Sequence, residues 1–336
     1  MSVHISVLGA GSWGTAIAIL LSSKYDDVIL WEFRPDVAKE LAEIRENRLM
    51  LPGVHIPEKI KIISDFEKSA KNRDVLILAV PSHVMREVAT RLSKVDFGNA
   101  ILVNVAKGLE NGTLMRMSEV IHDSIPGLSG DRVATLSGPS HAEEVSRNIP
   151  TAVVAASKHL KTAQDVQRIF MTPTFRVYAN SDLIGVELGG SLKNIIAIGA
   201  GISDGVGYGD NTKAALMTRA LVEITRLGTA MGADPLTFAG LSGMGDLIVT
   251  CMSRHSRNRY LGEQIGMGKT LQQVLDEMVM VAEGVRTTKS AHDLAKKYHV
   301  ELPITEQVYK VLFEGKSAKE AVSELMQRGA KIETWG

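Results

Sequence analysis

The sequence predicts two domains: an N-terminal α/β domain built on a doubly wound sheet, and an all-helical C-terminal domain. Up to about Leu183, short runs of β-branched and other apolar residues alternate with segments of helical spacing, which is typical of a doubly wound, largely parallel sheet. After Asp182 such runs almost disappear, and long helices rich in small residues are expected instead. We therefore expect one domain over residues 1–188 and a second over residues 189–336.

Seven segments of the first domain have the composition of strands. Most are continuously apolar, as expected for strands that helices cover on both faces of a parallel sheet. The expected strands are residues 4–9, 27–32, 74–80, 100–105, 132–137, 151–156 and 175–179. The spacing of apolar residues predicts helices at residues 11–23, 35–47, 84–93, 114–124 and 160–170.

In the second domain, residues 183–231 are expected to form long helices. Further along the chain, Thr270 is followed by Gln273, and Ser317 by Glu320. This Ser/Thr-x-x-Gln/Glu pattern is that of a capping box, so we expect a helix to begin at each place.

Composition excludes several classes of protein. The 38 Lys and Arg residues balance 38 Asp and Glu residues, giving a pI of about 7.1, whereas a nucleic-acid-binding domain is usually basic, with a pI above about 9. Hydrophobic residues make up 45% of the chain and charged residues 23%, as in soluble globular proteins rather than disordered ones. No Cys/His spacing typical of a metal site is present. We expect neither a nucleic-acid partner nor a bound metal.

The cysteine content and the N-terminus predict a cytoplasmic location. Cys251 is the single cysteine, so it has no intrachain disulfide partner, and we expect an inert core thiol. No signal-peptide pattern precedes the first strand. Apolar runs such as 17–21 and 195–198 are much shorter than the roughly 20 residues that span a bilayer, so we expect no membrane insertion.

The first expected strand leads into a Gly-x-Gly-x-x-Gly motif that opens the first expected helix. In such a motif Gly9 permits a tight turn, Gly11 lets the backbone approach a pyrophosphate, and Gly14 allows close helix–strand packing. The helix N-terminus then offers free N–H groups to the anion. The strand before the motif and the helix after it favour a dinucleotide site over a purely structural turn.

Two residues at the end of the second expected strand favour opposite cofactors. Glu32 lies 18 residues after Gly14, near the spacing at which an acidic group binds the ribose 2′-hydroxyl of NAD. Arg34 suits the 2′-phosphate of NADP. The alternative for both is structural, with Glu32 capping the strand and Arg34 solvated. The sequence leaves the choice between NAD and NADP open.

The second domain begins with a helix whose small residues recur on one face. Gly190, Asn194, Ala197 and Gly201 lie at steps of four, three and four, so we expect another segment to approach this face closely. Lys193 stands beside them among apolar residues, where a partly desolvated lysine can donate or accept a proton.

Several shorter motifs complete the set of candidates. Asp246 follows an expected glycine-rich turn, and Ser256, Arg257 and Asn258 form a consecutive donor set suited to phosphate oxygens. Lys107 and the segment 137–142 follow expected strands, at the sheet edge where doubly wound domains bind ligands. His83 also follows a strand, and contact with the cofactor and capping of a helix are equal alternatives for it.

Taken in order, these motifs resemble the bacterial NAD(P)-dependent sn-glycerol-3-phosphate dehydrogenases over almost the whole chain. The later motifs are much more specific than the first. The resemblance rests on Gly9-Ala-Gly-Ser-Trp-Gly-Thr-Ala, Lys107-Gly-Leu-Glu, Ser137-Gly-Pro-Ser, Leu192-Lys-Asn-Ile-Ile-Ala-Ile-Gly-Ala-Gly, Gly245-Asp-Leu-Ile-Val-Thr-Cys, Ser256-Arg-Asn-Arg and Glu283-Gly-Val-Arg-Thr.

The resemblance implies a Rossmann domain followed by a helical domain of the 6-phosphogluconate-dehydrogenase type. It implies reversible hydride transfer between sn-glycerol 3-phosphate and dihydroxyacetone phosphate with NAD or NADP, supplying the phospholipid backbone, and a homodimer. By this resemblance, Lys193 is expected to act as the general acid/base on the substrate C2 oxygen. The implied substrate contacts are Lys107, Gly138, Ser140, Lys193, Asp246, Ser256, Arg257 and Asn258. Besides the three motif glycines, the implied cofactor contacts are Ser12, Trp13, Phe33, Arg34, Lys107, Ala142, Arg257, Val281 and Glu283.

Two residues depart from the family pattern. His141 stands where phenylalanine is common, and Glu32 where a small residue is usual.

The alternative function is a related dehydrogenase that acts on another small hydroxyacid or sugar acid. A non-catalytic dinucleotide sensor and an S-adenosylmethionine enzyme are disfavoured by Lys193 and Asp246. Although the chain is neutral overall, we expect its site to be cationic.

Overall fold

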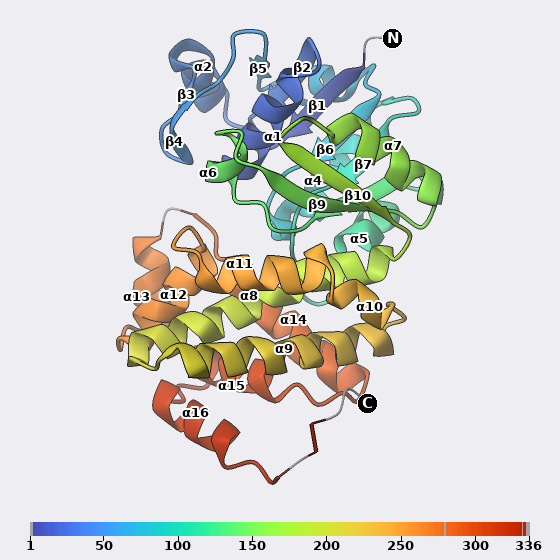
Figure 1. The fold of residues 1–336 in the computed structure, drawn as a ribbon. Coiled ribbons are helices and arrows are strands. Elements are labelled where there is room, and N and C mark those ends of the chain that lie inside the picture. Colours follow the sequence, from blue (N-terminus) through green and yellow to red (C-terminus); the bar gives the residue numbers. More distant parts are fainter. Residues whose placement is uncertain (1–2, 279, 331, 334–336) are drawn as a thin grey trace. The chain divides into compact units, whose positions relative to one another are not determined.

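A computed structural model of the chain describes residues 3–278, 280–330 and 332–333 (Figure 1). The chain divides into two compact units. The N-terminal unit comprises Met1–Lys107 and Met115–Leu183, and the C-terminal unit comprises Gly108–Leu114 and Ile184–Gly336. The short segment Gly108–Leu114 thus belongs to the C-terminal unit, although it lies within the N-terminal part of the sequence.

The N-terminal unit is built on an eight-stranded sheet in the order β10-β9-β8-β7-β6-β1-β2-β5. From β5 to β8 every neighbouring pair is parallel, β8 and β9 are antiparallel, and β9 and β10 are parallel to each other. The six parallel strands follow the order of a dinucleotide-binding sheet. Its strands are β1 (His4–Leu8), β2 (Asp27–Trp31), β5 (Lys61–Ile63), β6 (Val75–Leu78), β7 (Ile101–Asn104), β8 (Val133–Ser137), β9 (Thr151–Ala156) and β10 (Phe175–Asn180).

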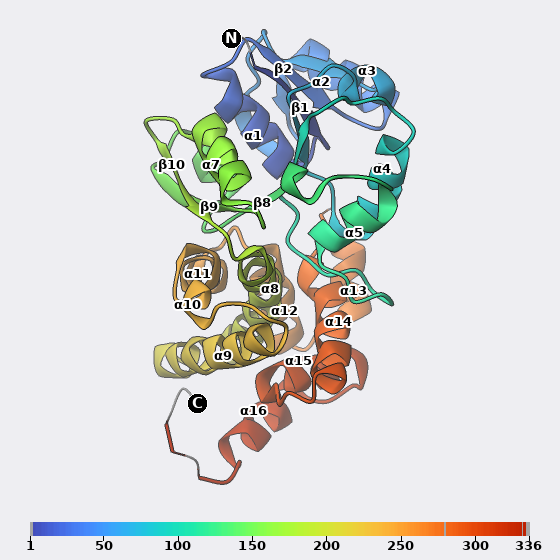
Figure 2. The same ribbon diagram turned by 90° about the vertical axis from the view of Figure 1, so that its right-hand side faces the viewer.

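Helices cover both faces of this sheet (Figures 1 and 2). Side chains of α1 and α7 join one core with the sheet, including Ile17 and Phe170. Side chains of α3, α4 and α5 join a second core, including Phe66 and Val88. The doubly wound prediction is therefore confirmed. The helices of this unit are α1 (Ser12–Ser22), α2 (Pro35–Ile44), α3 (Phe66–Ala70), α4 (Met85–Leu92), α5 (Met117–Ser124), α6 (Ala142–Val145) and α7 (Leu160–Phe170), with short 3₁₀ turns at Ser82–Val84 and Gly130–Arg132.

All seven strands expected from the sequence are present, but the region between β2 and β6 is more elaborate than expected. The helix predicted to continue to residue 47 ends at Ile44, because Arg45 takes a left-handed conformation with φ of 56°. A two-stranded antiparallel hairpin follows, formed by β3 (Glu46–Asn47) and β4 (Leu51–His55). Strand β5 and helix α3 were likewise not predicted. The helix expected from residue 114 begins at Met117.

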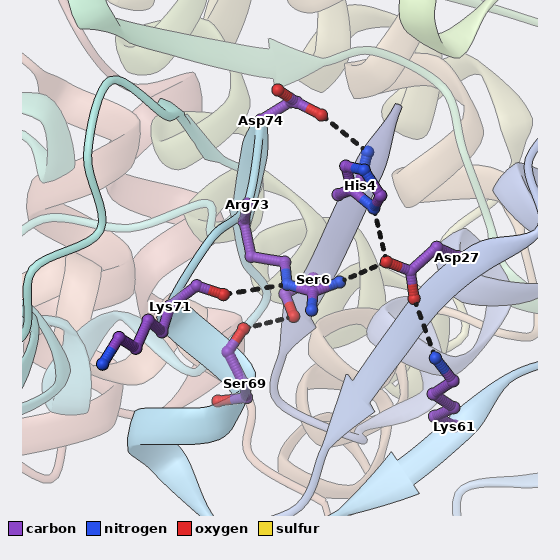
Figure 3. Close-up of polar contacts among 8 residues, drawn as sticks. All are labelled: His4, Ser6, Asp27, Lys61, Ser69, Lys71, Arg73 and Asp74. Carbon is purple, nitrogen blue, oxygen red and sulfur yellow. Dashed lines mark hydrogen bonds and ion pairs between the residues drawn. The ribbon is translucent and has the colours of Figure 1, made fainter. Parts of the chain in front are cut away.

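A polar cluster joins the amino-terminal ends of β1, β2 and β5 (Figure 3). The Asp27 carboxylate accepts from His4 Nδ1 at 2.6 Å, Arg73 Nη1 at 2.8 Å and Lys61 Nζ at 3.2 Å. The backbone N–H of His4 donates to Asp74, which lies just before β6. The cluster therefore links the strands at the sheet edge opposite the glycine motif.

Beyond residue 183 the regular secondary structure of the described residues is helical, as predicted. Both capping boxes, at Thr270 and Ser317, are formed. The sequence expected a turn before Asp246; instead, residues Leu241–Gly245 form a π-helical turn that continues into the next helix. The helices are α8 (Leu183–Val206), α9 (Asp210–Ala230), α10 (Pro235–Phe238), α11 (Asp246–Met252), α12 (Arg257–Gly266), α13 (Leu271–Glu277), α14 (Glu283–Lys297), α15 (Pro303–Phe313) and α16 (Ala318–Met326).

Helices α8 and α12 approach each other at backbone distance. A Cβ atom placed on Gly201 would lie 1.9 Å from the carbonyl oxygen of Arg259, and one on Gly262 would lie 2.0 Å from that of Ile198. Both glycines are required because no side chain fits between the two backbones. The close approach predicted from the small-residue face of α8 is confirmed, and helix packing explains it at Gly201.

Helix α8 has the length and hydropathy of a membrane span, although each of its continuous apolar runs is short. It contains 24 residues, and 89% of its most apolar window is buried inside the structure. The segment Pro235–Met252 passes the same test, with 44% of its window buried. Burial on this scale identifies α8 as the core helix of a folded unit.

Candidate active site

The glycine motif forms the turn between β1 and α1. Gly9 has φ of +118°, and a Cβ there would lie 2.7 Å from the Ala79 carbonyl oxygen. A Cβ on Gly14 would lie 1.9 Å from the carbonyl oxygen of Gly9. These two glycines are therefore required by the fold itself, because both positions are closed by backbone atoms.

Gly11 differs from its neighbours in the motif. A Cβ placed on Gly11 meets no atom of the described structure within 4 Å, so packing does not explain this glycine. Gly11 is also the N-cap of α1 and lacks a side-chain cap, leaving the first N–H groups of the helix to an outside acceptor. Next to it, the Trp13 Nε1 donor is buried without an acceptor in the described part of the chain. Open space beside unused donors fits the pyrophosphate of a dinucleotide.

Glu32 and Arg34 form a pair at the carboxyl end of β2. Only 4% of Glu32 is exposed, and its carboxylate accepts from Arg34 Nε at 2.9 Å and from the Arg34 backbone N–H at 3.3 Å. The Arg34 guanidinium also lies over the ring of Phe33, which is 65% exposed. Glu32, which favours NAD, and Arg34, which favours NADP, are thus hydrogen-bonded to each other. Glu32 holds the Arg34 guanidinium beside the exposed ring of Phe33.

A second cationic position follows β7 and β8. Lys107 Nζ donates to the carbonyl oxygen of Gly138 at 2.9 Å, and Ser140 Oγ donates to the same oxygen at 2.9 Å. Gly138 has φ of +138°, and a Cβ there would lie 2.9 Å from Val153 Cα, so only glycine fits. Because β1, β2, β7 and β8 are parallel, this group lies at the same sheet edge as the glycine motif.

In the C-terminal unit, the predicted Lys193 and Asp246 meet in a buried ion pair. Lys193 Nζ lies 2.5 Å from Asp246 Oδ1 and donates to Thr250 Oγ1 at 2.6 Å, while the Thr250 hydroxyl donates to the Asp246 carbonyl oxygen. At most 5% of each of the three residues is exposed. The sequence did not single out Thr250, although it lies four residues after Asp246, one helical turn away.

The π-helical turn explains how Asp246 reaches Lys193. A Cβ on Gly189 would lie 2.6 Å from the Ser242 carbonyl oxygen, so α8 and the turn touch at their backbones. Lys193 lies four residues after Gly189, and Asp246 four residues after Ser242. Residues four apart share a helix face, so the backbone contact places the lysine and the aspartate opposite each other.

The expected phosphate-binding segment forms the start of α12. Ser256 is the N-cap, and its hydroxyl accepts the backbone N–H of Arg259. Arg257 is exposed, whereas Ser256 and Asn258 are buried. The Asn258 side chain donates to Asn194 Oδ1 at 3.0 Å and accepts the Gly284 N–H at 2.9 Å. Asn258 thereby links α8, α12 and α14, a role that the sequence did not predict, and Asn194 contacts a predicted site residue.

The remaining predicted residues lie in both units. Ala142 begins α6, with His141 as its N-cap. Glu283 begins α14, and Val281 lies just before that helix, 39% exposed. His83 lies in a short 3₁₀ turn after β6. Cys251 is fully buried, and burial raises the pKa of its thiol to about 12, which agrees with the predicted inert thiol. Among the described residues no cluster of three or more metal-ligating side chains occurs.

Sequence comparisons agree with this arrangement. Profiles described as the N-terminus and the C-terminus of NAD-dependent glycerol-3-phosphate dehydrogenase match residues 4–163 and 182–323. A glycerol-3-phosphate dehydrogenase [NAD(P)+] of Pelotomaculum thermopropionicum is 57% identical over 98% of this chain and 94% of its own length. One from Thermoanaerobacter sp. is 56% identical over 99% of this chain and its entire length.

Structural comparison gives the same result. The crystal structure of glycerol-3-phosphate dehydrogenase from Coxiella burnetii is 38% identical, with a TM-score of 0.92 over 97% of this chain and 99% of that one. The resemblance read from the motifs is confirmed: the chain belongs to the family of NAD-dependent glycerol-3-phosphate dehydrogenases.

Proposed function

We propose that this protein catalyses the reversible interconversion of sn-glycerol 3-phosphate and dihydroxyacetone phosphate with NAD or NADP, making glycerol 3-phosphate for phospholipid synthesis. The observation that carries the proposal is the buried group of Lys193, Asp246 and Thr250 in a chain of this family. A buried ammonium held by a carboxylate and a hydroxyl is a positioned proton donor.

The N-terminal unit would hold the cofactor. Gly11 and the N-terminus of α1 would bind the pyrophosphate, with Gly9 and Gly14 fixing the turn. When bound, the nicotinamide ring supplies or accepts the hydride. The remaining cofactor contacts would come from Ser12, Trp13, Phe33, Arg34, Lys107, Ala142, Arg257, Val281 and Glu283.

Lys193 would act as the general acid and base. In the reductive direction its ammonium gives a proton to the C2 oxygen as the ketone carbon gains a hydride, so the product is the neutral alcohol. In the oxidative direction the neutral amine takes that proton back. Asp246 and Thr250 orient the ammonium, and Lys107 and Arg257 add positive charge that stabilises the developing oxyanion.

Substrate specificity would depend on the phosphate group. Ser256, Arg257 and Asn258 offer a hydroxyl, a guanidinium and an amide at the start of α12, and Gly138 and Ser140 lie beside Lys107. Charged donors bind phosphate strongly, so the cationic groups favour a phosphorylated substrate. A dehydrogenase of another small hydroxyacid or sugar acid has no observation of this kind in its favour.

We also propose a cytoplasmic homodimer. An exposed apolar stripe supports the dimer: Met244, Ile248 and Met252 recur every four residues and are 40%, 45% and 55% exposed. Such patches often mark contact surfaces. Light scattering on the wild type and on Ile248→Glu tests this proposal. A dimer that forms through this stripe should dissociate in the variant, whereas a monomeric wild type would contradict the proposal.

The decisive experiment follows the absorbance of NADH and NADPH during reduction of dihydroxyacetone phosphate by the purified protein. Unphosphorylated dihydroxyacetone and a panel of 2-keto acids serve as comparison substrates. We expect rapid oxidation of at least one cofactor with dihydroxyacetone phosphate and a loss of several orders of magnitude in kcat/KM without the phosphate. A folded protein that oxidises neither cofactor, or that prefers a keto acid, contradicts the proposal.

A further inference from the structure

The hairpin of β3 and β4 lies outside the main sheet, yet one of its side chains, that of Asn47, hydrogen-bonds to the glycine motif. Asn47 pairs with Leu51 in this hairpin and is 5% exposed. Its Nδ2 donates to the carbonyl oxygen of Ala10 at 2.8 Å and to Thr15 Oγ1 at 3.1 Å. Its Oδ1 accepts the backbone N–H of Met50 at 3.2 Å. The buried amide thus joins the hairpin to Ala10 within the motif and to Thr15 directly after it.

The Ala10 carbonyl lies between Gly9 and Gly11, in the turn proposed to approach the pyrophosphate. Such a turn binds an anion only if its N–H groups face the ligand and its carbonyl oxygens face away, because an exposed carbonyl oxygen repels the phosphate. Asn47 donates to this carbonyl from the protein side. The Ala10 carbonyl and the Gly11 N–H belong to one peptide plane, so this hydrogen bond fixes the direction in which the Gly11 N–H points.

Apolar packing holds the hairpin in place. Leu51 and Val54 of β4 form a small core with Ala16 of α1 and Ala142 of α6, and Trp13 packs against it. This core is separate from the two large cores of the unit. The hairpin therefore packs against α1, and it also touches Trp13 and Ala142, two residues that are expected to contact the cofactor.

We propose that Asn47 is a positioning residue for dinucleotide binding, acting through the Ala10 carbonyl and Thr15 rather than by touching the cofactor. The inference rests on the proposed function, since it concerns the same cofactor. Without the Asn47 amide, the turn at Ala10 samples orientations that do not bind the pyrophosphate. Restoring the binding orientation then costs conformational entropy, which weakens cofactor binding. The effect is confined to the cofactor.

The test compares Asn47→Ala with the wild type by calorimetric titration of NADH and NADPH and by steady-state kinetics. We expect the Kd and KM for both cofactors to rise roughly tenfold, the effect of one hydrogen bond of about 1 kcal/mol or slightly more. At saturating cofactor, kcat and the KM for dihydroxyacetone phosphate should stay within twofold. Asn47→Asp, which places an acceptor against the carbonyl, should bind cofactor at least as weakly as Asn47→Ala.

Glu46→Ala is the matched control, because Glu46 accepts the Gly53 N–H within the same hairpin at 2.8 Å and does not reach the motif. Equal losses of cofactor affinity in Glu46→Ala and Asn47→Ala would show that hairpin stability alone matters, which overturns the proposal. An unchanged cofactor Kd in Asn47→Ala also overturns it. If Asn47→Ala does not fold, Asn47→Ser replaces it with the same expectations. A wild-type protein that binds neither cofactor instead rejects the proposed function.

Discussion

The ammonium of Lys193 lies 2.5 Å from a carboxylate oxygen of Asp246, and both residues are at least 95% buried. A charge taken out of water is stable only with a close partner of opposite sign. The pair therefore ties catalysis and stability to the same two side chains, and the two effects are separable by experiment.

The first prediction concerns catalysis. Lys193→Met removes the proton donor while keeping a similar apolar stem, so kcat should fall on the order of 10²–10⁴-fold. Affinity for NADH should change little, since the expected cofactor residues lie mainly in the N-terminal unit. Stopped-flow and titration measurements check this, with exposed Lys296→Met on α14 as control. Near-normal turnover of Lys193→Met would remove Lys193 from the chemistry.

The second prediction concerns the stability of the same pair. Lys193→Met and Asp246→Asn each break the ion pair and leave its other charge buried, so each should lower the free energy of unfolding by on the order of 3 kcal/mol. The double variant should lose clearly less than the sum of the two. Urea unfolding of all four proteins measures the coupling, and additive losses would show that the pair contributes no net interaction.

The third prediction concerns the contact between α8 and α12. Alanine at Gly201 gains up to about 1 kcal/mol of helix propensity, but its methyl group would lie 1.9 Å from the Arg259 carbonyl oxygen. Relieving such a clash costs about 1–3 kcal/mol, so Gly201→Ala should lower the Tm. Gly329→Ala, where a Cβ meets no described atom within 4 Å, is the control and should leave the Tm unchanged.

The fourth prediction concerns acid stability and the Asp27 cluster. Burial opposes ionisation of Asp27, but hydrogen bonds from His4 and Lys61 and the charge of Arg73 outweigh it and lower its pKa to about 2. The pKa of Asp27 in the folded state lies below its usual value of 3.8. The contribution of the Asp27 carboxylate to the free energy of unfolding is therefore complete above pH 3.8 and is lost as the pH falls towards 2. Asp27→Asn should weaken this acid dependence, whereas Asp26→Asn, at a fully exposed position, should not.

The fifth prediction concerns Glu223 of α9, which accepts the backbone N–H groups of Ile304 and Thr305 at the start of α15. Burial raises its pKa to about 7, against these hydrogen bonds and the charge of Arg226. The folded state then holds a proton that the unfolded state releases near pH 4.5, so stability should fall as the pH rises from 4.5 to 7. Glu223→Gln should flatten that slope in urea unfolding; an unchanged slope would assign it to other groups.

Local sequence patterns were sufficient to predict much of the fold. The capping boxes at Thr270 and Ser317 and the strand–glycine–helix pattern at residues 9–14 depend on residues close in sequence, and all were found. The hairpin at residues 46–55 was missed because β3 has only two residues and β4 contains Pro52 and Gly53. Two residues are too few for a strand period to be recognised, and Pro and Gly are depleted in strands.

The site residues that were missed depend on contacts distant in sequence. Asn194 meets Asn258 across 64 residues, and Asn47 meets Ala10 across 37. The expectation from spacing that Glu32 lies near a ribose stays a prediction, and the structure adds that its carboxylate accepts from Arg34. Spacing alone predicted candidate site residues, whereas the groups that these residues contact could be found only from the fold.

The glycine contact between α8 and α12 has a consequence for how the C-terminal unit opens. Two helices whose backbones touch cannot separate by rotating a side chain, so we expect the two to unfold together. Their amide hydrogens should therefore exchange with deuterium as one cooperative group, at the slowest rates of the unit. Because α8 bears Lys193 and α12 follows Ser256, the protonation machinery and the phosphate-binding segment would persist or be lost together.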